Sequence, residues 1–234
     1  MRDHETELNI PFYYLGSRDY VNGLTIFEES LQTFLSIDGR ASRSIRRISR
    51  FNVQKFIRNN CRLKIIKNDS VSAQVRKAAA RIEVVTYDNT NWKLLLFERK
   101  NDPVVKRVAD YDRSIYIESE CQTSASETSV TLDNIEDFFS LVRGIVEANY
   151  RYCVNVAVRA DVHQGVSWAY LTNFNQPKDI DVSSHPVITF GEKSIVRAYD
   201  KVFIIRNFSV NKLSGNDESE ICFFFSDPNN NKNS

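Results

Sequence analysis

The chain has 234 residues, a hydrophobic share of 42% and a formal net charge of +1 at pH 7. This length suits one large domain or two small ones, and the apolar content, with 15 Phe and 10 Tyr, is enough for a sizeable core. The near-zero net charge excludes a global electrostatic field toward nucleic acid or membranes, so a charged partner must be attracted by a local patch.

Several functional classes are also disfavoured by missing motifs. The four cysteines form no CxxC pair, and the three histidines do not fall at metal-ligand spacing, so we expect no metal and no resident cofactor. P-loop, dinucleotide, HExxH and GxSxG motifs do not occur, which argues against NTPases, nicotinamide enzymes, zinc proteases and α/β-hydrolases. The N-terminus lacks a signal-peptide core and no run approaches the roughly 18 apolar residues of a membrane span, so we expect a soluble cytoplasmic protein with no membrane partner.

The first predicted element is a helix over residues 24–35, in which steps of three and four place the apolar side chains on one face. A polar cluster stands directly before this helix, in the segment SRDYVNG. The cluster residues that draw attention are Asp19, Tyr20, Asn22 and Gly23. They form either an ordinary turn whose side chains bond nearby backbone or the lip of a binding site, and both interpretations stay open.

A basic segment follows over residues 39–67, with ten Lys and Arg and no acidic residue. It is either a solvated surface or a dock for an acidic partner, since acidic carrier proteins and the phosphates of coenzyme A both need cations. Single-stranded nucleic acid is the competing partner, because Phe51 and Phe56 interleave with the cations and could stack on bases.

The remaining elements are predicted in chain order. Residues 80–99 form two β-prone runs around the turn-type cluster YDNTN, which predicts a hairpin. Residues 98–114 are polar and contain a proline, which predicts a linker. A second amphipathic helix is predicted over residues 133–150, with Asp133 as N-cap. Residues 150–160 and 165–174 are predicted to be paired strands, and residues 201–227 a closing hairpin.

The two halves repeat one pattern, an apolar helix followed by strands and a long hairpin. We therefore expect an α+β protein with one unit over residues 1–105, a second over residues 106–228 and a disordered tail over residues 229–234.

This pattern, together with the segment DYVNGLTIFEESLQTFL and the later runs ARIEVV and WKLLLFER, resembles the hot-dog fold superfamily of thioesterases and acyl-carrier-protein dehydratases. The resemblance implies two hot-dog-like halves, each a central helix wrapped by an antiparallel sheet. It further implies processing or binding of acyl thioesters of coenzyme A or acyl carrier protein, in fatty-acid or polyketide biosynthesis. The partner is then the acyl-CoA or acyl carrier protein, and a homodimer stays open.

The resemblance also implies a site at the start of helix 24–35, where backbone N–H groups can polarise a thioester carbonyl. In this hypothesis Asp19 orients water or a substrate hydroxyl, Tyr20 holds the carbonyl, and Asn22 and Gly23 shape the site. The cations expected to contact the phosphopantetheine phosphate or an acidic carrier are Arg46, Arg47 and Arg50.

The sequence departs from the dehydratase pattern, because no histidine accompanies the first helix; His163 and His185 both follow the second. Dehydration is therefore disfavoured, and a carboxylate mechanism through Asp19, Glu28 or Glu29 stays open. Two rival functions also stay open: a non-catalytic ligand- or partner-binding protein of the same fold, and a nucleic-acid-binding protein that uses residues 40–67.

Overall fold

The computed structural model describes residues 6–37, 45–67, 77–110, 112–122, 127–159, 167–175, 185–198, 201–211 and 219–226. The chain divides into two compact units, Met1–Tyr111 with Leu171–Gln176, and Asp112–Tyr170 with Pro177–Ser234. The boundary expected after residue 105 lies inside the first unit, and the expected tail lies outside the described residues. In the described ranges no helix has the length and apolar character needed to cross a bilayer.

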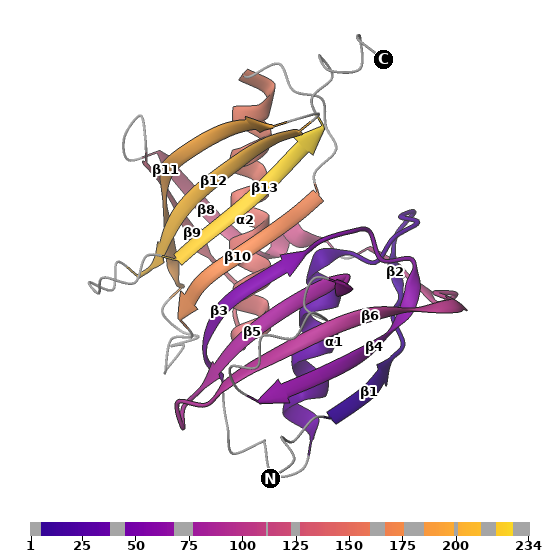
Figure 1. Cartoon of the computed structure of the whole chain (residues 1–234). Coiled ribbons are helices and arrows are strands. Elements are labelled where there is room, and N and C mark those ends of the chain that lie inside the picture. The colour runs from indigo at the N-terminus through magenta and orange to yellow at the C-terminus, as the bar shows by residue number, and fades with distance from the viewer. Residues whose placement is uncertain are drawn as a thin grey trace. The chain divides into compact units, whose positions relative to one another are not determined.

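The first unit consists of an antiparallel sheet and a helix. The helix is α1 (Gly23–Ser36), and the strands are β1 (Thr6–Ile10), β3 (Ile45–Val53), β4 (Asn59–Lys67), β5 (Ala80–Thr86) and β6 (Asn91–Pro103). Hydrogen-bonded neighbours follow the order β1-β4-β6-β5-β3. Two short strands, β2 (Tyr14–Leu15) and β7 (Arg107–Val108), form a separate parallel pair. Figure 1 shows α1 lying along one face of the sheet.

Helix α1 confirms the helix predicted over residues 24–35. Its apolar face is packed on the sheet, and the side chains of Phe27 and Phe34 are 0% exposed. The ring of Phe27 lies 5.3 Å from that of Phe51 on β3, and the ring of Phe34 lies 5.6 Å from that of Trp92 on β6. Burying these aromatic rings supplies most of the stabilisation that a helix of this length cannot obtain from its own hydrogen bonds.

Strand β3 carries part of the basic segment, and its pairing with β5 has two irregularities of register. Its inward residues Ile45, Ile48 and Phe51 are buried, although they are spaced by three positions rather than two. Register shifts against β5 between Ile45/Arg47 and Ile48/Arg50 absorb the additional residues, as β-bulges do. Because the shifts restore alternation, Arg47 and Arg50 both belong to the face of the sheet opposite α1.

Strands β5 and β6 confirm the hairpin predicted over residues 80–99. They pair antiparallel, and Asn89 in the turn has a φ of 59°, a left-handed conformation that asparagine tolerates. The linker predicted over residues 98–114 is wrong, because β6 continues to Pro103 and β7 follows it. The end of β6 is largely exposed, so its polarity is that of a solvated strand end rather than a linker.

The second unit also combines an antiparallel sheet with a helix. The helix is α2 (Phe138–Arg159), a short 3-10 turn covers Arg113–Tyr116, and the strands are β8 (Ile117–Gln122), β9 (Glu127–Leu132), β11 (Val187–Ala198), β12 (Lys201–Val210) and β13 (Ser219–Ser226). Hydrogen-bonded neighbours follow the order β13-β12-β11-β9-β8. The β12–β13 pair confirms the hairpin predicted over residues 201–227.

The strand predicted over residues 150–160 is wrong, because helix α2 continues to Arg159. Tyr, Cys and Val favour strands locally. However, extending an existing helix adds one hydrogen bond per residue and needs no new nucleus. The partner segment 165–174 is a strand as predicted, β10 (Ser167–Asn175), but its expected pairing with 150–160 is wrong.

The start of α2 also differs from the prediction, since Asp133 precedes the helix. The capping position belongs to Asp137, whose Oδ1 accepts the N–H of Ser140 at 2.7 Å. Within the helix, a Cβ at Gly144 would lie 2.7 Å from Cδ1 of Leu132 on β9. The missing side chain therefore allows α2 to approach its sheet closely.

Candidate functional site

Asn22 and Gly23 form the start of α1. Asn22 is the N-cap, and its Oδ1 accepts the N–H of Leu24 at 2.8 Å. That donor is therefore committed to the cap and is not available to a carbonyl. Gly23 is the first helical residue, and the glycine of this region with a left-handed backbone is Gly16, with a φ of 57°. The structure thus gives both predicted site residues a local structural role.

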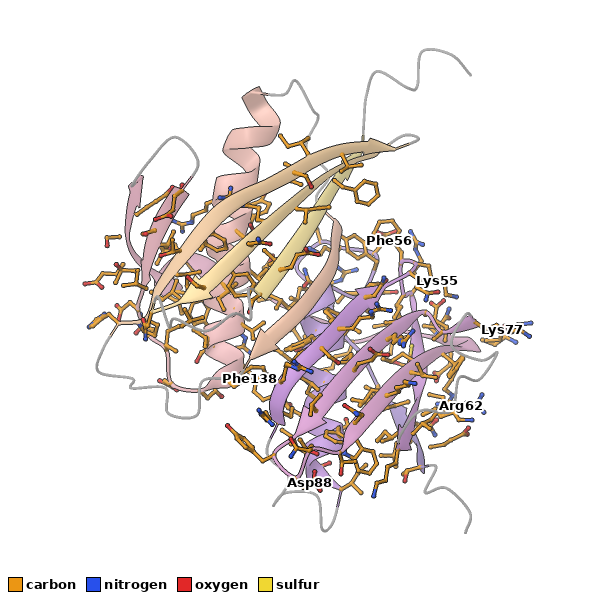
Figure 2. The ribbon with its side chains drawn as sticks, turned by 60° about the vertical axis from the view of Figure 1, so that its left-hand side comes forward. Lys55, Phe56, Arg62, Lys77, Asp88 and Phe138 are labelled. Atoms are coloured by element: carbon orange, nitrogen blue, oxygen red, sulfur yellow. The ribbon has the colours of Figure 1, made fainter. Side chains whose placement is uncertain are left out.

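Asp19 and Tyr20 lie beside the loop that joins β3 to β4. Asp19 Oδ2 is 3.3 Å from Nη2 of Arg58, and the Asp19 side chain is 77% exposed. The Tyr20 ring lies 4.8 Å from the ring of Phe56, which is 47% exposed. Figure 2 shows Phe56 and its neighbour Lys55 at the same end of the first unit. Of the two residues predicted to act on the thioester, Asp19 therefore faces solvent and Tyr20 is half-buried.

The loop that carries Phe56 and Arg58 is held by one carboxylate, Glu98. Its Oε1 accepts the N–H groups of Arg58 at 2.8 Å and Asn59 at 3.2 Å, and its Oε2 lies 2.5 Å from Nζ of Lys55. Burial raises the pKa of Glu98, but the hydrogen bonds from Lys55, Arg58 and Asn59 outweigh it, and the pKa lies below its usual value.

A pocket of about 250 Å³ opens beside α1 in the first unit. Its lining comes from the β1–β2 connection, α1, β4 and the loop before β7, and consists of Pro11, Phe12, Tyr13, Glu29, Asn60, Val105 and Lys106. Asn60 is fixed in the wall, since its Oδ1 accepts the N–H of Phe12 at 2.8 Å. Lys106 Nζ lies 5.5 Å from the centre of the Tyr13 ring, within cation–π range.

Glu29 is the ionisable group of this pocket that can act as an acid or a base. Burial raises the pKa of its carboxyl above the usual value, and the neighbouring carboxylate of Glu28 raises it further. The ammonium group of Lys106 acts in the opposite direction. A carboxyl group with a raised pKa in a pocket, next to a cation, is typical of general acid–base sites.

The arginines predicted to bind phosphate do not join the Asp19 cluster. Nη1 of Arg46 donates to Oδ1 of Asn89 in the β5–β6 turn at 2.6 Å. At about 3.3 Å per residue, Arg46 lies roughly 20 Å along β3 from the loop that carries Phe56. Arg47 and Arg50 lie on the face of the sheet opposite α1. The structure therefore separates the arginines from the helix start.

Sequence reasoning considered Glu29 but favoured Asp19, and it missed Tyr13, Asn60 and Lys106. These pocket residues come from segments far apart in the chain, so no sequence spacing relates them. The one sequence signal for this pocket is the position of Glu29 in the second turn of the predicted helix, close to the polar cluster.

Cys61 is a buried thiol rather than a nucleophile. Its residue is 0% exposed, and burial, followed by the charge of Glu98, raises its pKa to about 12. We expect a maleimide to label Cys61 about 10³-fold more slowly in the native protein than in denaturant, because thiolate is the reactive form. Labelling followed by peptide mass spectrometry measures this ratio. Equal rates in the two states would contradict it.

The second-unit histidine that the structure describes lies on the surface. Nδ1 of His185 is 3.1 Å from Oε2 of Glu118 and 3.6 Å from Oδ1 of Asp133, while His163 lies outside the described residues. Within the described part of the chain, no group of His, Cys, Asp and Glu is arranged to hold a metal ion.

No family model matches this sequence, and no curated protein matches it. Some solved structures are similar to this chain at low sequence identity and with TM-scores below 0.5. The PpsC dehydratase domain from Mycobacterium tuberculosis, in complex with C12:1-CoA, is 10% identical with a TM-score of 0.44, covering 94% of this chain and 92% of that one. The tesB protein of Mycobacterium avium subs paratuberculosis is 10% identical with a TM-score of 0.46, covering 92% and 91%.

A monomeric dehydratase domain from a trans AT polyketide synthase split module is 7% identical with a TM-score of 0.42, covering 97% of this chain and 98% of that one. We derive no function from likenesses at this level. The chain is an α+β protein in which antiparallel sheets accompany the helices α1 and α2.

Proposed function

We propose that the first unit binds and processes an acyl thioester of coenzyme A or acyl carrier protein, with Glu29 as the acid–base group. The observation that carries this proposal is the pocket beside α1, which combines a carboxyl group of raised pKa with the Lys106 ammonium and a partly apolar lining.

The pocket supplies the elements that thioester hydrolysis requires. The deprotonated Glu29 carboxylate would orient a water molecule and accept its proton as the water attacks the carbonyl carbon. Lys106 would stabilise the negative charge that develops on the carbonyl oxygen. Phe12 and Tyr13 would hold the apolar chain next to the carbonyl.

In this proposal the surface cluster of the exposed Asp19 and Arg58 and the half-buried Tyr20 contacts the part of the substrate that remains outside the pocket. The two compact units would then be the two hot-dog halves that the resemblance implies, and the first half alone would carry a site. Fatty-acid or polyketide biosynthesis stays a prediction of the resemblance, a cytoplasmic location stays a prediction from the sequence, and a homodimer stays open.

The test compares two carboxylates that the proposal treats differently. Glu29→Gln should lower kcat toward a panel of acyl-CoA and acyl-carrier substrates by about 10²- to 10⁴-fold, as loss of a general base does. Asp19→Asn should change kcat by less than about tenfold, since its carboxylate is exposed and paired with Arg58. Glu7→Gln is the matched control, because Glu7 is an exposed acid on β1 that pairs with Arg62.

The pH profile provides a second readout. Because the base must be deprotonated and its pKa is raised, kcat/KM should increase with pH through a pKa above the usual glutamate value. A wild-type protein that neither binds nor turns over any acyl thioester would contradict the proposal. Loss of turnover in Asp19→Asn with full activity in Glu29→Gln would transfer the role to Asp19.

A further inference from the structure

Three cations surround one carboxylate on the face of the first sheet opposite α1. In the antiparallel register, Arg50 of β3 stands directly opposite Glu83 of β5, and Glu83 stands directly opposite Lys93 of β6. Arg81 lies two residues before Glu83 on the same strand and therefore on the same face. Side chains at such positions are close enough to interact across and along the strands.

The single carboxylate is already engaged. Nη2 of Arg81 forms an ion pair with Oε1 of Glu83, and the two side chains are 19% and 20% exposed. Among the described residues, Arg50 and Lys93 form no ion pair. The cluster therefore carries more positive charge than its own carboxylate neutralises.

Arg81 in particular is left with unused binding capacity. Its Nε is buried and has no hydrogen-bond partner, although an unpaired buried donor is costly. Burial, followed by the nearby positive charge of Arg50, lowers the pKa of Arg81.

We infer that Arg50, Arg81 and Lys93 form a binding site for a phosphate group on the outer face of the first sheet. A phosphate dianion would relieve the repulsion between the two arginines and offer acceptors to their planar donor groups. Arg47, the next outward residue along β3, extends the positive surface. This inference does not rest on the proposed thioester function, because the pocket with Glu29 lies on the side of the helix.

The charge of the whole unit favours the same ligand. The first unit contains 20 Lys and Arg against 13 Asp and Glu, whereas the second contains 11 against 17. The near-neutral net charge of the chain is therefore the sum of a positive first unit and a negative second unit. Exposed cations such as Arg62 and Lys77 project from the first unit in Figure 2. Such a field attracts anions before they reach the site.

The phosphate group could be carried by a coenzyme or by the backbone of a nucleic acid, and the experiment distinguishes these sources. Binding to the full chain is measured by calorimetry with inorganic phosphate, with 3′,5′-ADP and with a single-stranded oligonucleotide. Tighter binding of 3′,5′-ADP in a one-to-one complex identifies a coenzyme phosphate. Tighter binding of the oligonucleotide, with a steep salt dependence, identifies a nucleic acid.

The variants are Arg50→Gln and Arg81→Gln, and the matched control is Arg46→Gln on the same strand. Both variants should weaken phosphate binding at least about tenfold, as expected for loss of a charge-assisted contact. The control should bind like the wild type, because Arg46 bonds Asn89 instead.

A second measurement separates binding from folding. Because Arg50 is exposed and repels Arg81, Arg50→Gln without ligand should have a Tm no lower than that of the wild type, while phosphate should raise its Tm less than it raises that of the wild type. The inference is overturned if phosphate does not bind the wild type at millimolar concentrations. It is equally overturned if Arg50→Gln binds as well as the wild type, or if Arg46→Gln loses binding to the same extent.

Discussion

Replacing Phe34 by alanine is expected to lower the free energy of unfolding of the first unit by about 3–5 kcal/mol, the range observed for buried Phe to Ala changes. Phe34 is 0% exposed, and its ring packs edge-on against Trp92 of β6 at 5.6 Å. The change would remove the aromatic contact and leave a cavity between α1 and the sheet. Guanidinium denaturation followed by circular dichroism measures the loss.

The matched control for Phe34→Ala is Gln32→Ala in the same helix. Gln32 is exposed, and surface changes of this kind usually stay within about 0.5 kcal/mol. A Phe34→Ala variant that loses no more stability than Gln32→Ala would show that α1 does not pack on the sheet as described.

Replacing Glu98 by glutamine is expected to cost about 1–3 kcal/mol at pH 7, because the backbone donors of Arg58 and Asn59 lose a charged acceptor. The pKa of Glu98 is lower in the folded state than its usual value of 4.5. Its stabilising effect is therefore complete above the unfolded pKa and is lost as the pH falls through the folded pKa. The difference between wild type and variant should consequently shrink below about pH 4.

Unfolding free energies at pH 7 and at stepwise lower pH measure this dependence. Glu7→Gln is the control, since its exposed ion pair with Arg62 should contribute no more than about 1 kcal/mol. A Glu98→Gln variant whose stability deficit is the same at every pH would contradict the assigned role. Because Glu98 holds the loop of Phe56 and Arg58, the variant should also loosen the contact between Phe56 and Tyr20.

The parts of the fold that could be predicted from sequence are those with local signals. The three- and four-residue spacing of Leu24, Phe27 and Leu31 defines one helical face, and the turn residues around Asn89 separate two alternating runs. In both elements the apolar residues recur in the sequence at the same spacing at which buried residues recur in the structure. The strand predicted over residues 150–160 is wrong because its local signal did not decide the structure. Extension of the existing helix α2 outweighed the local strand preference of Tyr and Val.

The candidate site was less predictable for a physical reason. Asp19, Tyr20 and Asn22 suggested a site because they are neighbours in the sequence. In the structure Asn22 caps α1, Asp19 pairs with Arg58, and Tyr20 contacts Phe56. A pocket requires residues that converge in space, and Glu29 and Lys106 are brought together only by the packing of α1 beside the loop before β7. The buried environment that raises the pKa of Glu29 does not exist until the chain has folded.

Local sequence patterns are sufficient to predict an α+β protein with amphipathic helices, antiparallel hairpins and a basic segment, because periodicity, turn residues and charge are properties of neighbouring positions. Where the side chains of the basic segment lie depends on the tertiary structure. The two bulges in β3 direct Arg47 and Arg50 to one face, and strand pairing places Arg50 opposite Glu83, which lies two residues after Arg81 on β5. Distances between strands depend on register, and register is a property of the whole sheet.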